Sequence, residues 1–226
     1  MDTINKPKNS GKSVKQLLAY DYLSKEEASE NVKNSFNYLP NDSYLKHKYT
    51  FRKRAFTKCE FKENFKLLIL KNSIFEQDIR INKYAGGISR NYEPVDLNIV
   101  NYVTNFFIIN KDYFSDLKEL TQIGIHQIRI TAINDNEGFP VPEGYHQDGV
   151  DYVIIVPIQS FFVCGGINSI RYGSQDGPEI MNNKIKHNNA LILNDRRVFH
   201  YASPIYAQYK NIEGYRDSLI ITIQEK

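Results

Sequence analysis

The stretch that decides the fold is Ile123–Ile133, "IGIHQIRITAI", in the middle of the chain. Successive side chains of an extended backbone point to opposite faces, so this alternation predicts a strand. Gln127 and Arg129 would lie on a polar face, and His126 and Ile128 on an apolar one. An Arg between two isoleucines is costly to bury without a partner, which makes the polar face a candidate wall of a wet site.

Short apolar runs of the same kind continue to the end of the chain, separated by turns rich in Gly, Asn and Asp. They are residues 152–158, 161–164, 190–194, 199–203 and 218–223. No periodic segment of helix length interrupts them, which favours an antiparallel barrel or jelly roll over a parallel α/β sheet. The sequence therefore predicts a mainly β fold with flanking helices (α+β).

The helices are predicted outside these strands. Ser24 in "SKEE" forms a capping box with Glu27, and Val32 and Phe36 follow at four-residue spacing. Two more segments each open with an aspartate at the N-cap position: "DLNIVNYVTNFFIIN" from Asp96 and "DYFSDLKEL" from Asp112. We expect one domain over residues 1–226: a flexible tail (1–11), a helical segment (12–48) and a β core (49–226) with helices inserted at about 96–120.

Composition limits the class of protein. With 41% hydrophobic and 24% charged residues, the 226-residue chain is typical of a soluble domain. Residues 1–58 carry twelve Lys/Arg against six Asp/Glu, but no aromatic and basic array of a nucleic-acid module, so no nucleic-acid partner is expected. The longest apolar runs are strand-sized, which predicts no membrane partner. Two cysteines outside a CxxC pattern suit a cytoplasmic protein, and sixteen Tyr and thirteen Phe would suit a homodimer patch.

The residues "GYHQDGV", 144–150, introduce metal chemistry. His146 and Asp148 leave an extended segment on the same side and can occupy adjacent positions on an octahedral ion. His200 in "NDRRVFHYASPI" would complete a two-histidine, one-carboxylate set, which suits non-haem Fe(II). Taken alone, "HQDG" is equally well explained as a tight Asp-Gly turn. One residue of the charged turn 194–197 could orient His200 or close the site, although the sequence does not indicate which residue.

An anion receptor is predicted near the C-terminus. Arg216 and Ser218 in "GYRDSLIITI" alternate with Asp217 and so share a face. A guanidinium and a hydroxyl side by side form a receptor for a carboxylate. The order of a metal pair, a distal histidine and this receptor predicts three metal ligands and an anchor for a dicarboxylic cosubstrate.

From about residue 49 onward the chain resembles the Fe(II)/2-oxoglutarate-dependent dioxygenases, which have a double-stranded β-helix (jelly-roll, cupin-like) core. More narrowly, it resembles the bacterial isoleucine-dioxygenase-like family, which hydroxylates free L-amino acids. The stretches that carry the resemblance are "FRKRAF", "YAGGISRNYEPV", "HQIRI", "PEGYHQDGVDYVII", "GGINSIR", "LNDRRVFHYASPI" and "GYRDSLIITI". The three metal residues point to the superfamily, and the order of the other segments points to the narrower branch.

The resemblance implies that His146, Asp148 and His200 bind iron and form the catalytic centre. It also implies that 2-oxoglutarate chelates the iron and pairs its far carboxylate with Arg216 and Ser218. With O2, and with ascorbate as reductant in vitro, the products would be succinate, CO2 and a hydroxylated amino acid. Related halogenases lack the carboxylate ligand, so Asp148 favours hydroxylation over halogenation.

A free amino acid needs both a cation and an anion in its pocket. The candidate cations are Arg129, with a structural ion pair or contact to 2-oxoglutarate as alternatives, and Arg90 in the loop after "GG". The candidate anions are Glu143 and Asp151, and Gly165-Gly166 is either a pocket wall or a tight turn. Two other functions stay open: an oxygenase of the same fold acting on a peptide, nucleobase or carrier-bound substrate, and a metal-dependent sensor barrel.

Overall fold

The computed structural model describes residues 13–45, 50–77, 79 and 87–225, and the expected tail at residues 1–11 lies outside them. Its helices are α1 (Glu30–Ser35) and α2 (Leu97–Ile109), with 3-10 turns η1 (Val14–Gln16), η2 (Phe36–Tyr38) and η3 (Glu63–Phe65). Its strands are β1 (Tyr20–Ser24), β2 (Arg52–Phe61), β3 (Leu67–Ile69), β4 (Ile74–Phe75), β5 (Arg90–Asn91), β6 (Gln122–Ala132), β7 (Tyr152–Phe161), β8 (Val163–Gly165), β9 (Asn168–Tyr172), β10 (Glu179–Asn183), β11 (Asn189–Asn194), β12 (Val198–Ala202), β13 (Ile205–Ala207) and β14 (Gly214–Gln224).

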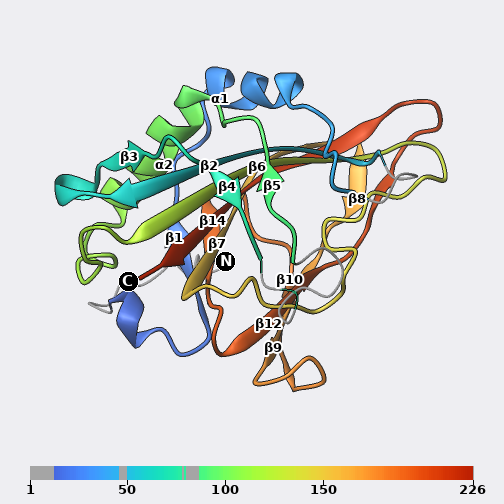
Figure 1. The fold of residues 1–226 in the computed structure, drawn as a ribbon. Helices are drawn as coiled ribbons and strands as arrows, with labels where there is room; N and C mark the ends of the chain where they lie inside the picture. The colour runs from blue at the N-terminus through green and yellow to red at the C-terminus, as the bar shows by residue number, and fades with distance from the viewer. Residues whose placement is uncertain (1–12, 46–49, 78, 80–86, 226) are drawn as a thin grey trace, which may run out of the picture.

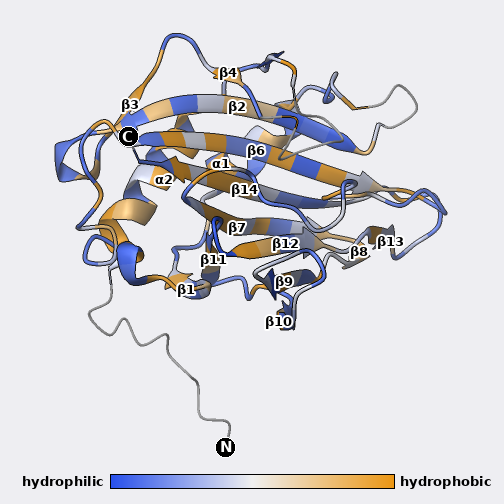
Figure 2. Ribbon diagram, turned by 60° about the horizontal axis from the view of Figure 1, so that its bottom comes forward, coloured by the Kyte–Doolittle hydropathy of each residue, from blue (hydrophilic) through white to orange (hydrophobic). Residues whose placement is uncertain are grey.

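A large antiparallel sheet organises the molecule, in the order β1-β11-β7-β14-β6-β2-β3. Its centre is β14, which pairs along its whole length with β6 and also with β7. These strands run side by side (Figure 2). A smaller sheet, β10-β9-β12, lies below the large one in Figure 1. The mostly β fold predicted from the sequence is confirmed, and it is consistent with a jelly-roll oxygenase.

Each face of the large sheet packs on a different partner. On one face, α2 buries Ile99, Val103 and Phe107 against a core that includes Ile125 of β6 and Ile221 of β14. The opposite face joins the smaller sheet through a second core of residues from both sheets: Val153, Ile155, Ile170, Met181, Leu191, Leu193 and Val198. The large sheet is therefore covered on both sides, and the functional site lies on the side of the smaller sheet.

Two helix predictions were wrong in detail. Ser24 does not cap a helix, because it ends strand β1 and its backbone pairs with Asn189 of β11, so the expected helical segment also contains a strand. The helix starts at Glu30, and the Ser29 hydroxyl accepts from the Val32 N–H as its N-cap. The helix from Asp96 is confirmed, with its N-cap.

The helix predicted from Asp112 is absent, since residues 110–116 form turns. Asn110 ends α2 because its side-chain amide donates to the carbonyls of Phe106 and Ser24.

No helix among the described residues is long and apolar enough to cross a membrane.

Candidate active site

His146 and His200 are brought together by backbone pairing. The His146 N–H donates to the His200 carbonyl at 3.1 Å, and the reverse bond measures 2.9 Å, so the loop of His146 adds to the edge of β12. Their rings lie 4.2 Å apart between centroids. The Gly144 carbonyl, 3.1 Å from His146 Nδ1, can only accept, which places the proton on Nδ1. The Nε2 lone pair of His146 is therefore available to a metal ion.

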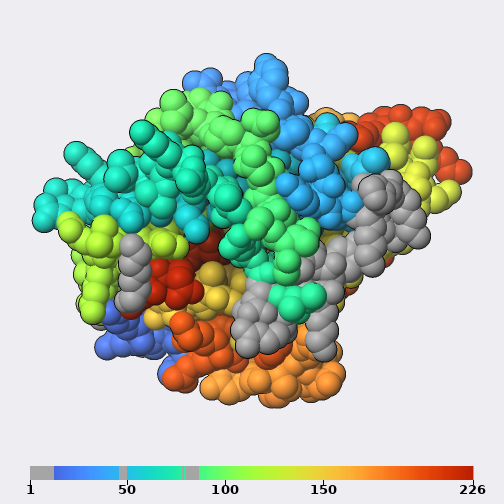
Figure 3. All heavy atoms as spheres, viewed as in Figure 1, coloured from blue at the N-terminus to red at the C-terminus, as the bar shows by residue number. Residues whose placement is uncertain are grey.

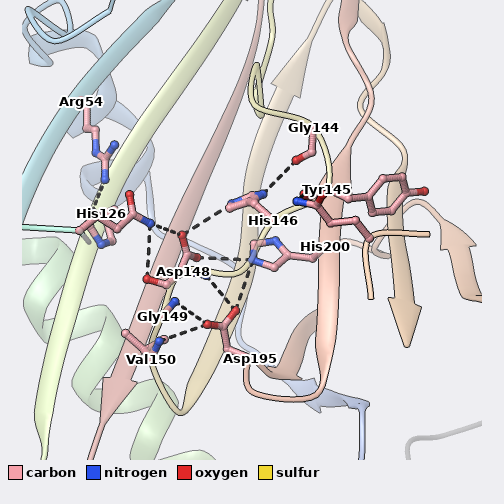
Figure 4. A network of polar contacts seen from close by, with 12 residues as sticks. Arg54, His126, Gly144, Tyr145, His146, Asp148, Gly149, Val150, Asp195 and His200 are labelled. Atoms are coloured by element: carbon pink, nitrogen blue, oxygen red, sulfur yellow. Dashed lines mark hydrogen bonds and ion pairs between the residues drawn. The ribbon is translucent and has the colours of Figure 1, made fainter. Parts of the chain in front are cut away.

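Asp148 faces both histidines (Figure 4). Its two carboxylate oxygens lie 3.6 Å from His146 Nε2 and 3.5 Å from His200 Nε2. The side-chain amide of Gln77 donates to the same carboxylate at 3.1 Å. Burial raises the pKa of Asp148, but the two histidine rings beside it outweigh burial and hold this pKa well below its usual value. The group is thus an ionised, oriented carboxylate.

Asp195 holds the loop that carries Asp148. It is almost completely buried, and its carboxylate accepts from the backbone N–H groups of Asp148 at 3.1 Å, Gly149 at 2.7 Å and Val150 at 3.1 Å. It also lies 3.7 Å from His200 Nε2. Burial, followed by the charge of Asp148, raises the pKa of Asp195. Within the charged turn 194–197, Asp195 thus supports the site through the loop of Asp148 and not through a hydrogen bond to His200.

The three side chains fit a metal ion. Ligand atoms of His146, Asp148 and His200 all lie within 4.8 Å of one another. His200 Nε2 is buried without a hydrogen-bond partner, which is a costly state unless another ligand satisfies it. Two imidazoles and one carboxylate, with positions left open, suit non-haem Fe(II).

A cavity of about 470 Å³ contains these residues, and Arg216 and Ser218 also line it. A hollow opens on this face between the segment near residues 60–75 and the C-terminal half, where red atoms of the C-terminal strand are visible (Figure 3). Burial lowers the pKa of Arg216 to about 10, so the guanidinium stays charged near neutrality. Gly166 leaves room for the Arg216 guanidinium, because a Cβ at this position would lie 3.0 Å from Arg216 Nη1. The φ of Gly166 is +65°, which also favours glycine.

Several predicted pocket residues lie elsewhere. Arg129 is on the helix side of the sheet, where its guanidinium holds Asp217 through two 2.7 Å bonds, so the structural ion pair is its role. Asp151 also lies outside the cavity lining and pairs with the exposed Arg196. Gly165 makes a tight backbone approach, because a Cβ would lie 2.2 Å from the Pro204 carbonyl oxygen. The polar face of β6 is therefore not the wall of the site.

The cavity wall is formed instead by the other face of β6 and by β2. Arg90 and Glu143 line it as predicted, and Arg54 and His126 line it without having been predicted. Arg54 Nη2 donates to His126 Nδ1 at 2.7 Å, and His126 stacks on Phe56 with centroids 4.5 Å apart. The signal for Arg54 was the alternation of Arg, Arg, Phe and Lys at 52, 54, 56 and 58. Asn168, whose buried amide nitrogen has no partner, was also missed.

Comparisons with known proteins identify the family of the chain. The chain matches the family model described as 2OG-Fe dioxygenase over residues 33–222. No curated protein sequence matches it. A BsmA homolog from Methylobium petroleophilum PM1 has a TM-score of 0.72 and 24% identity, over 85% of this chain and 79% of that one.

Two further solved structures share the fold. IDO from Bacillus thuringiensis gives a TM-score of 0.65 at 20% identity, over 92% of this chain and 95% of that one. The Fe(II)/(alpha)ketoglutarate-dependent dioxygenase TqaL gives 0.61 at 14% identity, over 88% and 76%. Because the family model spans both histidines, the carboxylate between them and the C-terminal strand, the chain belongs to the 2OG-Fe dioxygenase family of enzymes that use Fe(II), 2-oxoglutarate and O2.

Proposed function

We propose that this dioxygenase hydroxylates the side chain of a free L-amino acid and releases succinate and CO2. The observation that carries the proposal is the charge of the cavity wall. Besides Arg216, which would serve 2-oxoglutarate, the wall contains the buried guanidinium groups of Arg54 and Arg90 and the carboxylate of Glu143. A zwitterionic amino acid would complement this wall, because its carboxylate could meet the guanidinium groups and its ammonium could meet the carboxylate.

In this proposal, His146, Asp148 and His200 hold Fe(II), which when bound supplies the activation of O2 for attack on a C–H bond. Asp195 and Gln77 fix the direction of the Asp148 carboxylate through the bonds described above. Arg216 and Ser218 bind the far carboxylate of 2-oxoglutarate and so set its orientation. Phe56, Ile128 and other apolar residues of the lining limit water in the cavity.

The free-acid substrate is favoured over a carrier-bound, peptide or nucleobase substrate, because a thioester, amide or base offers no carboxylate to Arg54 and Arg90. Asp148 beside the two histidines supports hydroxylation over halogenation, since the carboxylate occupies the position a halide would need. Assembly as a homodimer and a cytoplasmic location stay predictions from the sequence.

The proposal is tested by succinate release from protein supplied with Fe(II), ascorbate, O2 and 2-oxoglutarate, with each of the twenty L-amino acids in turn. Stimulation by one or a few amino acids supports it. Stimulation only by peptides or tethered acyl groups would instead support an oxygenase of the same fold that acts on a peptide or carrier-bound substrate. An iron-loaded protein that turns over no 2-oxoglutarate would support the sensor interpretation.

A further inference from the structure

Arg90 has an unusual environment for a charged group. Its side chain is almost completely buried, with 2% of the residue exposed, and it lines the cavity from β5. Its guanidinium carbon lies 5.1 Å from the centre of the Phe75 ring. The Nε and Nη2 atoms, which form one edge of the guanidinium, are both buried without a hydrogen-bond partner.

The same edge is filled elsewhere in this chain. Arg129 uses its Nε and Nη2 to hold the two carboxylate oxygens of Asp217, each at 2.7 Å. Arg52 directs its Nε to Asp42 at 2.7 Å. An unpaired buried charge is expensive, and two parallel N–H groups match a carboxylate. The empty edge of Arg90 is thus a site of the right shape and charge for a carboxylate that the described part of the chain does not supply.

Arg54 adds a second positive charge beside it. Its guanidinium carbon lies 4.9 Å from the ring centre of Phe75, the ring that Arg90 also covers, and 4.8 Å from that of Tyr92. Its Nη2 donates to His126 Nδ1, and because a guanidinium only donates, that nitrogen carries no proton and the imidazole is neutral. The Arg54 Nε is also buried without a partner. The part of the wall around Phe75 therefore holds two cations and a neutral imidazole ring.

The carboxylates of the cavity do not neutralise this wall. Asp148 is directed to the two histidines, and Glu76 accepts from the Ser89 hydroxyl. Glu143 also lines the cavity, but it makes no hydrogen bond to the Nε or Nη2 atom of Arg90. Among the described residues, no carboxylate reaches the Nε–Nη2 edge of Arg90.

The wall is also distinct from the anchor proposed for 2-oxoglutarate. Ser218 of β14 pairs with Ile128 of β6, and Ile128 pairs with Arg54 of β2. The backbones that carry Ser218 and Arg54 are therefore two strands apart, or about 10 Å at the usual strand spacing. One dicarboxylic cosubstrate that also chelates the metal cannot fill both anion positions, so the second position remains for another molecule.

We propose that the Nε–Nη2 edge of Arg90, with Arg54 beside it, binds the carboxylate of the primary substrate and makes a free carboxylate a requirement for binding. This inference rests on the proposed function and names the subsite that gives it specificity. The substrate is held by its carboxylate at the wall formed by β2 and β5. Its side chain is then left to face His146, Asp148 and His200.

The test is calorimetric binding without O2, using protein loaded with metal and 2-oxoglutarate and titrated with the L-amino acids and their α-carboxamides. Wild type should bind the best amino acid more tightly than its amide by about 10- to 150-fold, the range of one charge-assisted pair. Arg90→Gln should lose that preference and leave 2-oxoglutarate binding within about twofold. Arg90→Lys, which keeps the charge but not the edge, should keep part of the preference. Arg197→Gln, at an exposed position outside the cavity, is the matched control.

If wild type bound the amino acid and its amide equally, Arg90 would not be a carboxylate subsite, and the proposed amino-acid hydroxylase activity would be unaffected. The same conclusion would follow if Arg90→Gln, shown to be folded by its circular dichroism, kept the full preference. If no amino acid bound or stimulated turnover, both the proposed function and the proposed subsite would be refuted. The two failures are therefore distinguishable.

Discussion

Replacing Asp195 with Asn should weaken the metal centre without touching a ligand. The Asp195 carboxylate accepts three backbone N–H groups: one oxygen takes that of Asp148, and the other takes those of Gly149 and Val150. An asparagine keeps one acceptor oxygen. In its best orientation it keeps Gly149 and Val150, and turns its NH2 group toward the N–H of Asp148. The hydrogen bond that is lost is thus the one to Asp148, the residue that must face the metal.

The magnitude follows from that geometry. One buried N–H left unsatisfied costs about 1–3 kcal/mol. Loss of a partner that orients a ligand lowers metal affinity by about 10- to 100-fold. The lost negative charge, 3.7 Å from His200 Nε2, acts in the same direction because it faces the metal position.

The assay is the dissociation constant of Fe(II), measured without O2 by competition with a chelator. Asp151→Asn is the matched control, because that neighbouring carboxylate accepts from Arg196, Gln224 and the Glu225 N–H outside the cavity lining. It should change iron affinity by no more than about twofold. Equal iron affinities of the Asp195→Asn and Asp151→Asn proteins would refute the positioning role.

Three other outcomes are expected. Arg216→Gln should raise the KM for 2-oxoglutarate by about 10- to 150-fold with little change in that of the amino acid, and equal rises would count against the anchor. Arg129→Gln should lower the free energy of unfolding in urea by about 3–5 kcal/mol, because it leaves the buried Asp217 carboxylate without a counter-charge. An unchanged urea midpoint would contradict a stabilising ion pair. Burial, followed by the charge of Arg54, holds the pKa of His126 well below 6.5, so unfolding takes up a proton below that pH. Relative to His126→Gln, wild type should therefore lose up to about 1.4 kcal/mol of stability per unit as pH falls below 6.5, and a pH-independent difference would disprove a neutral His126.

The sequence predicted those features of the fold and site that depend on short-range spacing. The alternation in β6 and β14 gave the strands and the shared face of Arg216 and Ser218, because side-chain direction in a strand has a period of two. The i, i+2 spacing gave the shared side of His146 and Asp148. These relations hold within one segment, so no knowledge of the tertiary structure was needed.

The errors came from partners that are distant in sequence. Arg129 looked like the wall of a wet site because Asp217, which neutralises it, comes from the neighbouring strand. In a sheet covered on both faces, polarity alone does not tell which face borders a cavity. Ser24 had a complete capping box, yet pairing with β11 overrode it. The sequence did not distinguish Asp195 from its charged neighbours, because the backbone N–H groups that it accepts belong to the loop of Asp148, more than forty residues earlier.

The central claim is tested most directly by turnover of the stimulating amino acid under 18O2, with mass spectrometry of both products. The proposed function predicts one labelled oxygen in the hydroxylated amino acid and one in succinate, with the two products formed in equal amounts. Labelled succinate accompanied by an unchanged amino acid would contradict it.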